Sequence, residues 1–586
     1  MPSKPILVVV LAIGAWSVFA PAQKPDPLPA LETRVERLQA HLESIESIRA
    51  IKRLQYAYGH YVEFGLWNDF ADLFAADALT NYQAGVRGKD AIRQLFFEKV
   101  GQGKLGLSDG RVYPHILFQP VITLAPSGRT AKGRWRILAM LGGYGGSATW
   151  YSGVYENEYV FEDGVWKISV IHSEPKVMAA YTAAGWKDSG VHVPFHYTAA
   201  DVTASIPESG KLSAKAANGT TASLKSLADR VNQLARRTAR LNDQAEVTNL
   251  QDTYGYAVDR KLWDQVADLF AANGTLELGL QGVYVGKASI RRALDQFGPQ
   301  GLREGELNDH VLLETLVSVA PDGRTAKARG VELIMSNGHG GELSEGVYEN
   351  TFIQENRRWK IQSVHFYPRM IVDAAAGWAK SAKPAPGPSK AFPPDRPPTA
   401  SYEIYPKFAV APFHFDNPVT GKPPQYPEGV RFAASPAPTA APLSGAAIRN
   451  VKDLEAAVAE AERSLAAAEA CDAAENLIGV YSYYLDESPS DAASLFVQPG
   501  RNTISERSNF VNQILQPVID VAPDGKSAKI RARLLGLGGT SGGAGYWKEG
   551  TLEGQIISEQ GAWRFQTVHS SPRWSAPYPG GWARIP

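Results

Sequence analysis

The chain has 586 residues, which is enough for three or four domains. Lys+Arg and Asp+Glu are equal at 60 each, so no basic excess indicates nucleic-acid binding. A hydrophobic fraction of 44% with 10% aromatic residues is typical of globular domains with sizeable cores. The single cysteine, Cys471, excludes an internal disulfide framework, so each domain depends on its own core.

Residues 1–22 have the layout of a secretory signal peptide. Lys4 precedes an apolar stretch from Ile6 to Trp16, and Ala20-Pro21-Ala22 is a small-x-small cleavage site before Gln23. The apolar stretch is short for a bilayer span. We therefore expect a periplasmic or secreted protein without a membrane span.

Three copies of one unit follow in the same order. LWNDFADLFAAD from Leu66 matches LWDQVADLFAAN from Leu262, and APSGRTAK from Ala125 matches APDGRTAK from Ala320 and APDGKSAK from Ala522. The repeats predict domains at 31–186 and 223–378 and a degenerate copy at 451–586. The intervening 187–222 is a polar linker. Residues 379–450 form a Pro-rich linker whose aromatic residues, Phe408, Phe413 and Phe415, suggest that part of it docks.

Within a copy the hydrophobic period changes from helical to extended. Apolar residues step by four and three from Leu31 through Val35 and Leu38, which is typical of an amphipathic helix. Alternating stretches such as 115–124 and 130–138 come later and are joined by Pro-x-Gly turns. The fold class predicted for each copy is α+β, with helices packed on one face of a curved antiparallel sheet.

Two motifs recur in the complete copies, and one copy adds a tyrosine. An acidic residue lies four positions before a tryptophan, at Glu63 and Asp259, and a histidine opens the strand before the Pro-x-Gly turn, at His115 and His310. Tyr82 lies in the predicted strand after the acidic segment of the first copy. These features resemble the SnoaL-like branch of the nuclear transport factor 2-like superfamily, which includes scytalone dehydratase.

The resemblance implies cone-shaped domains whose open end holds a small molecule. It also implies catalysis by an acid–histidine pair that transfers a proton, with a tyrosine that orients the substrate and with no cofactor or metal. On this basis the candidate residues are Glu63, Tyr82, His115, Asp259 and His310. The family's second histidine falls on Leu141 and Ser336, so the dehydration specific to that family is not expected.

Structural interpretations of the same residues stay open. Glu63 and Asp259 could cap the following helix, and either pocket histidine could be a hydrogen-bonded core residue. In the third copy Asp486 keeps the acidic position but Asn512 replaces the histidine, so that copy is expected to be catalytically silent. His172, His365 and His569 persist in all three copies and are interpreted as structural.

The sequence therefore favours a cofactor-independent lyase, dehydratase or isomerase that acts on a small aromatic or cyclic molecule. The alternatives are a binding protein for a hydrophobic small molecule and a structural repeat assembly. For partners we expect a small-molecule ligand, no nucleic acid, a pseudo-dimer of domains 1 and 2, and a homodimer through domain 3.

Overall fold

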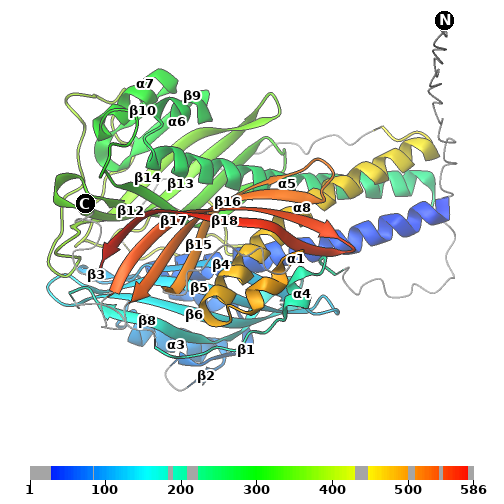
Figure 1. Ribbon diagram of the computed structural model, residues 1–586, viewed down its shortest axis with the longest axis horizontal. Helices are drawn as coiled ribbons and strands as arrows, with labels where there is room; N and C mark the ends of the chain where they lie inside the picture. Colours follow the sequence, from blue (N-terminus) through cyan, green and yellow to red (C-terminus); the bar gives the residue numbers. More distant parts are fainter. Residues whose placement is uncertain are drawn as a thin grey trace, which may run out of the picture.

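The computed structural model describes residues 28–82, 85–182, 189–207, 222–428, 447–498, 509–539 and 545–578 (Figure 1). The expected signal peptide lies outside these ranges, so its cleavage stays a prediction. Across the described ranges, no helix combines the length and the hydropathy that a membrane span requires. The chain forms three α+β domains in tandem, each with helices against a curved sheet.

Domain 1 begins with a long helix and continues into a mixed sheet. Its elements are α1 (Leu28–Phe64), α2 (Trp67–Asp72), β1 (Phe74–Thr80), β2 (Val86–Arg87), α3 (Lys89–Lys99), β3 (Arg111–Val112), β4 (His115–Leu124), β5 (Thr130–Gly143), β6 (Ala148–Glu162), β7 (Val165–Ile171) and β8 (Ser173–Ala180). The main strand order is β2-β1-β7-β6-β5-β3, with β4 paired to β5 and β8 to β6. The β1–β7 pair is parallel. The sheet is therefore mixed, whereas the sequence predicted an antiparallel one.

Domain 2 repeats this plan after the short helix α4 (Ala199–Thr203). Its elements are α5 (Leu224–Asp259), α6 (Trp263–Leu269), β9 (Phe270–Leu278), η2 (Gly279–Gln281), β10 (Val283–Val285), α7 (Gly286–Leu294), η3 (Asp295–Phe297), β11 (Asn308–Val319), β12 (Thr325–Ser336), η4 (Gly338–Gly340), β13 (Glu342–Glu355) and β14 (Arg358–Asp373). The strand order is β10-β9-β14-β13-β12-β11, and β9 again pairs in parallel with β14.

Domain 3 consists of a long helix and an antiparallel sheet. Its elements are α8 (Val451–Glu487), η5 (Asp491–Leu495), β15 (Asn509–Val521), β16 (Ser527–Gly539), β17 (Gly545–Glu559) and β18 (Ala562–Pro577), paired in chain order. Residues 499–508, where the degenerate third copy is expected to be shorter than the other two, lie outside the described ranges.

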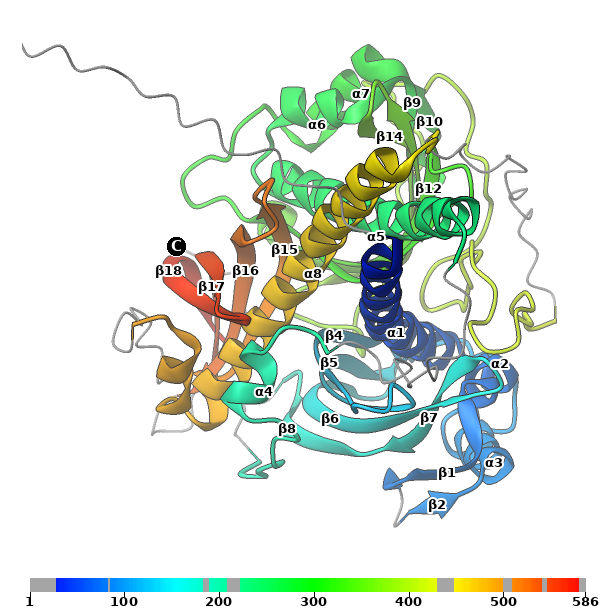
Figure 2. The same ribbon diagram turned by 90° about the vertical axis from the view of Figure 1, so that its right-hand side faces the viewer.

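The three domains meet around a common centre. The N-terminal parts of α1, α5 and α8 lie against one another (Figure 2), and their apolar stripes form one core that includes Leu38, Leu234 and Leu465. The sheet faces turned away from the helices form a second shared core, with Trp150 of domain 1, Met335 of domain 2 and Trp547 of domain 3. A homodimer through domain 3 stays a prediction.

The described part of the Pro-rich segment, up to residue 428, docks on domain 1. Val410 and Phe415 are buried in the domain 1 core, and the Asn417 side chain donates a hydrogen bond to the main-chain carbonyl of Asp69. His414 is joined to Glu349 of domain 2, so the segment also links domains 1 and 2.

Candidate functional site

The interior of domain 2, called cone 2 here, holds a histidine and a carboxylate at hydrogen-bond distance. His310 and Leu312 share one face of β11 because side chains alternate along a strand, and Leu312 belongs to the core between the sheet and α5. Glu332 of β12 lies directly opposite Leu312 and shares that face. His310 Nδ1 and Glu332 Oε1 are 2.6 Å apart, a charge-assisted pairing.

Electrostatics in cone 2 favour a basic imidazole. Burial alone would lower the pKa of His310, but the hydrogen bond and charge of Glu332, with smaller effects of Asp259 and Asp309, raise it overall. The His310 side chain keeps 17% of its surface exposed. Because Nδ1 faces Glu332, Nε2 is the nitrogen available to exchange a proton with a bound molecule.

The interior of domain 1, called cone 1 here, surrounds its histidine with tyrosines. His115 Nε2 is hydrogen-bonded to the Tyr155 hydroxyl at 2.7 Å, and the rings of Tyr58 and Tyr113 lie about the imidazole. His115 is 8% exposed and its Nδ1 is buried without a hydrogen-bond partner. Burial lowers the pKa of His115 to about 3, so the ring is neutral at physiological pH.

The acids expected to pair with these histidines form interdomain ion pairs instead. Asp259 accepts a hydrogen bond from the main-chain N–H of His310, not from its ring, and its other oxygen pairs with Arg533 of domain 3. Glu63 pairs with Arg369 of domain 2, while the His115 ring bonds to Tyr155. The predicted acid–histidine side-chain pairs are therefore not formed, and each carboxylate instead pairs with an arginine of the neighbouring domain.

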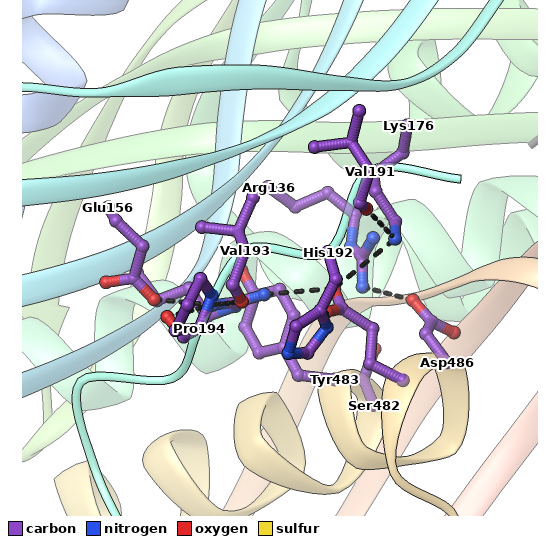
Figure 3. A network of polar contacts seen from close by, with 12 residues as sticks. Arg136, Glu156, Lys176, Val191, His192, Val193, Pro194, Ser482, Tyr483 and Asp486 are labelled. Atoms are coloured by element: carbon purple, nitrogen blue, oxygen red, sulfur yellow. Dashed lines mark hydrogen bonds and ion pairs between the residues drawn. The ribbon is translucent and has the colours of Figure 1, made fainter. Parts of the chain in front are cut away.

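The third copy shows the same use of its acid. Asp486 pairs with Arg136 of domain 1 at 2.5 Å (Figure 3) and accepts hydrogen bonds from the Asn512 main chain and side chain. The Arg136 guanidinium also lies over the Tyr483 ring. The acid of each domain thus reaches an arginine of the next, from domain 1 to 2, from 2 to 3 and from 3 back to 1.

The remaining candidate, Tyr82, lies just after β1 and not in a strand as predicted. Its ring is 41% exposed and packs against Phe96, and it lies close enough to Tyr58 and Tyr113 to influence their pKa values. No hydrogen bond between Tyr82 and His115 occurs among the described residues.

The three histidines interpreted as structural do not share one environment. His172 is half-exposed beside Glu174, and His569 is exposed. His365 is mostly buried, stacks on Tyr367 and lies 3.6 Å from Glu277, and burial lowers its pKa to about 4. These three positions therefore do not share a buried hydrogen bond of the imidazole ring.

Sequence reasoning missed Glu332, which supplies the carboxylate of cone 2. The equivalent position in cone 1 is Ile137, opposite Leu117 as Glu332 is opposite Leu312. An acid on the inward face of an otherwise apolar strand, present in one repeat only, was the available signal.

A separate cavity of about 390 Å³ lies where the three domains meet, outside both cones. It is lined by the middle of α1, α5 and α8 and by β4, β11 and β15. Asp252 on α5 is 3% exposed, lines this cavity and has no hydrogen bond or ion pair among the described residues. Burial, with the nearby charge of Glu475, holds the pKa of Asp252 well above its usual range.

Comparison with known proteins identifies the class that this α+β cone represents. Residues 43–172 and 239–365 each match the model of the SnoaL-like domain. The chain therefore carries two SnoaL-like domains of the nuclear transport factor 2-like type, and α8 with the sheet of β15–β18 repeats part of the same plan. The resemblance expected from the acid, histidine and tryptophan positions is confirmed.

Solved structures that match include a proposed scytalone dehydratase from Novosphingobium aromaticivorans, at 21% identity over 26% of this chain and 98% of that one, with a TM-score of 0.22. A type 2 hexachlorocyclohexane dehydrochlorinase matches at 19% identity over 26% of this chain and 97% of its own, with a TM-score of 0.21. An NTF2-like protein with a cystatin-like fold from Novosphingobium aromaticivorans matches at 19% identity over 25% and 92%, with a TM-score of 0.20. A search of curated proteins finds no match.

Proposed function

We propose that cone 2 is the catalytic site of a cofactor-independent lyase, dehydratase or isomerase that acts on a small cyclic or aromatic molecule. The observation that carries the proposal is the 2.6 Å contact between His310 Nδ1 and Glu332 Oε1 inside the cone. A carboxylate on one ring nitrogen fixes the tautomer and increases the basicity of the other nitrogen. Cone 1 lacks that carboxylate, so cone 2 is preferred.

The chemistry follows from this geometry. His310 Nε2 takes a proton from a carbon next to an electron-withdrawing group, and the electron pair of that C–H bond forms a new double bond. In an elimination the group on the adjacent carbon leaves with its electrons, and in an isomerisation the proton returns to another carbon. Glu332 stabilises the imidazolium that forms in between. The hydroxyl of Tyr254, whose pKa is raised by burial and to a lesser extent by Glu332, stays protonated and can donate to substrate oxygen.

The test is incubation of the purified protein in D₂O with phenolic, lignin-derived and steroid-like compounds, followed by mass spectrometry. We expect deuterium incorporation or loss of a small molecule from one compound class. His310→Gln is expected to abolish this change, and His115→Gln should leave most of it. Equal activity in the wild type and in a folded His310→Gln variant would contradict the proposal.

A second candidate function is small-molecule binding in the cavity where the three domains meet. Its volume lies in the range of ligand sites, about 300–1,000 Å³. The raised pKa of Asp252 keeps its unpartnered carboxyl neutral, and a bound amine would supply the positive charge that lets it ionise, which favours a cationic ligand over the purely hydrophobic one expected from sequence. In a thermal-shift screen of small amines and their neutral analogues, stabilisation by amines that is lost in Asp252→Asn would support this function. Equal shifts in both proteins would count against it.

A further inference from the structure

The three interfaces between domains share a set of equivalent positions. The acid of each domain is Glu63, Asp259 or Asp486. The residue three positions before it packs against a buried strand residue of a neighbouring domain, and the backbone of that strand residue has positive φ. Between domains 2 and 3, Tyr256 donates a hydrogen bond to the main-chain carbonyl of Gln516, at 2.9 Å. Between domains 3 and 1, Tyr483 donates to the carbonyl of Gln119 at 3.0 Å. Tyrosine and glutamine therefore form a neutral pair at these two interfaces.

The interface between domains 1 and 2 replaces both members of this pair. His60 stands at the tyrosine position and Glu314, with φ of 56°, at the glutamine position. The acid at this interface is Glu63. His60, Glu63 and Glu314 are 0%, 1% and 3% exposed, so three groups capable of binding metal replace a set with only one.

These three side chains face one another. His60 Nδ1 lies 3.7 Å from Glu63 Oε2 and 3.8 Å from Glu314 Oε2, and one ligand atom from each residue lies within 4.8 Å of the others. Two metal–ligand bonds of about 2.1 Å span at most about 4.2 Å, so an ion between the imidazole and either carboxylate needs no rearrangement of that pair.

The facing atoms lack partners. Neither ring nitrogen of His60 forms a hydrogen bond of normal geometry, and Glu63 Oε2 and Glu314 Oε2 also have no partner. Buried polar atoms without hydrogen-bond partners destabilise the fold, so native proteins rarely place several together. At the equivalent positions of the other interfaces, a single side-chain atom, Gln516 Nε2, is buried without a hydrogen-bond partner.

Contacts on the far oxygens orient both carboxylates toward His60. The second oxygen of Glu63 is held by Arg369, and Glu314 Oε1 accepts a hydrogen bond from the Leu117 main-chain N–H at 3.4 Å. These contacts orient both carboxylates and leave one oxygen of each toward His60. Imidazole nitrogen with carboxylate oxygen is a donor set suited to Zn²⁺ and neighbouring divalent transition metals.

We propose that His60, Glu63 and Glu314 bind one divalent transition-metal ion, of the Zn²⁺ class, that ties domain 1 to domain 2. All three side chains are buried, and Glu314 also borders the cavity where the domains meet. Because the ligands come from two domains, we assign the ion a structural role. It lies apart from the proposed catalytic pair in cone 2. Loss of the metal therefore weakens the domain interface without removing His310 or Glu332.

The chain supplies its own control variant. Combining His60→Tyr with Glu314→Gln rebuilds the neutral pair found at the other two interfaces, and Glu314→Gln alone is a nearly isosteric second variant. Full-length protein is stripped with a chelator, titrated with Zn²⁺ against a chromophoric competitor and measured for metal content by mass spectrometry.

We expect one Zn²⁺ per wild-type chain, a rise in melting temperature on loading, and loss of both effects in the variants. The double variant without metal should melt no lower than the metal-free wild type, because it replaces the unpaired imidazole of His60 and the unpaired carboxylate of Glu314. Equal Zn²⁺ binding by the wild type and the Glu314→Gln variant would mean an adventitious ion only. Absence of stoichiometric binding of any first-row divalent metal by the wild type would also overturn the proposal.

Discussion

Cones 1 and 2 hold a histidine at the same position of the same strand, yet its surroundings differ. His115 is enclosed by tyrosines, and burial lowers its pKa to about 3. His310 is joined to Glu332, stays partly exposed and has a raised pKa. One inward-facing position, isoleucine in cone 1 and glutamate in cone 2, accounts for much of this difference. Equivalent histidines in tandem repeats can therefore have opposite electrostatic character.

The largest expected effect is on turnover. His310→Gln should reduce the rate on an identified substrate by about 10²–10⁴, because general acid–base catalysis is lost. His115→Gln should change the rate far less, since its ring is closed off and already neutral. Steady-state kinetics on both variants, with circular dichroism to confirm folding, measures the difference. A large loss in His115→Gln alone would assign the chemistry to cone 1 and reverse the comparison.

The second effect is on acid stability. Because the folded pKa of His115 is about 3 and the ordinary value is 6.5, only the unfolded chain takes up its proton between these values. Its contribution is present above pH 6.5 and is lost as the pH falls toward 3, at about 1.4 kcal/mol per pH unit. For His310 the sign is opposite: its contribution is present below pH 6.5 and is lost as the pH rises through the raised folded value.

Urea unfolding between pH 4 and 8 tests these two signs. The free energy of unfolding of the wild type, minus that of His115→Gln, should fall as the solution is acidified. The same difference for His310→Gln should fall as the solution is made alkaline. Two parallel curves would show that the two rings have the same environment, contrary to the structure.

Much of the fold was predictable because the chain repeats itself. The helical and extended periods, fixed in order across the copies, predicted α+β domains with a long first helix, and α1, α5 and α8 are those helices. The parallel pairing of β1 with β7 was not predictable, because hydrophobic alternation carries no information on strand direction.

The site was predictable only in part. The position of His310 came from the repeat, but its partner did not, because Glu332 occurs in one copy. Asp259 was interpreted as that partner from the family resemblance, and its contact with Arg533 could not be predicted because the two residues lie far apart in the chain. The sequence of the third copy pointed away from an acid–histidine pair, because Asp486 is kept there although Asn512 replaces the histidine. An acid that is kept without the histidine is better explained by a contact at the domain interface than by catalysis.

Removing one tyrosine hydroxyl from each cone compares the two sites through the free energy of unfolding. Tyr155→Phe takes away the partner of His115 Nε2 and leaves a buried polar atom unpaired, which should cost about 1–3 kcal/mol. The equivalent change in cone 2, Tyr348→Phe, removes a hydroxyl that pairs with Thr315, which is only partly buried. Its cost should be smaller. Chemical denaturation of both variants gives the difference, and equal losses would show that the His115–Tyr155 bond contributes nothing specific.

The smallest expected effect is a shift in the pKa of His310. Glu332→Gln keeps the shape of the side chain but removes the charge that opposes the effect of burial on His310, so the pKa of His310 should fall. NMR titration of the ring protons measures this shift, and the acid limb of the rate profile should move to lower pH with it. Glu355→Gln, at the far end of β13 from His310, is the control and should leave both unchanged. If Glu332→Gln leaves the titration of His310 where it was, the 2.6 Å contact does not set the basicity of the ring, and the proposed advantage of cone 2 over cone 1 is lost.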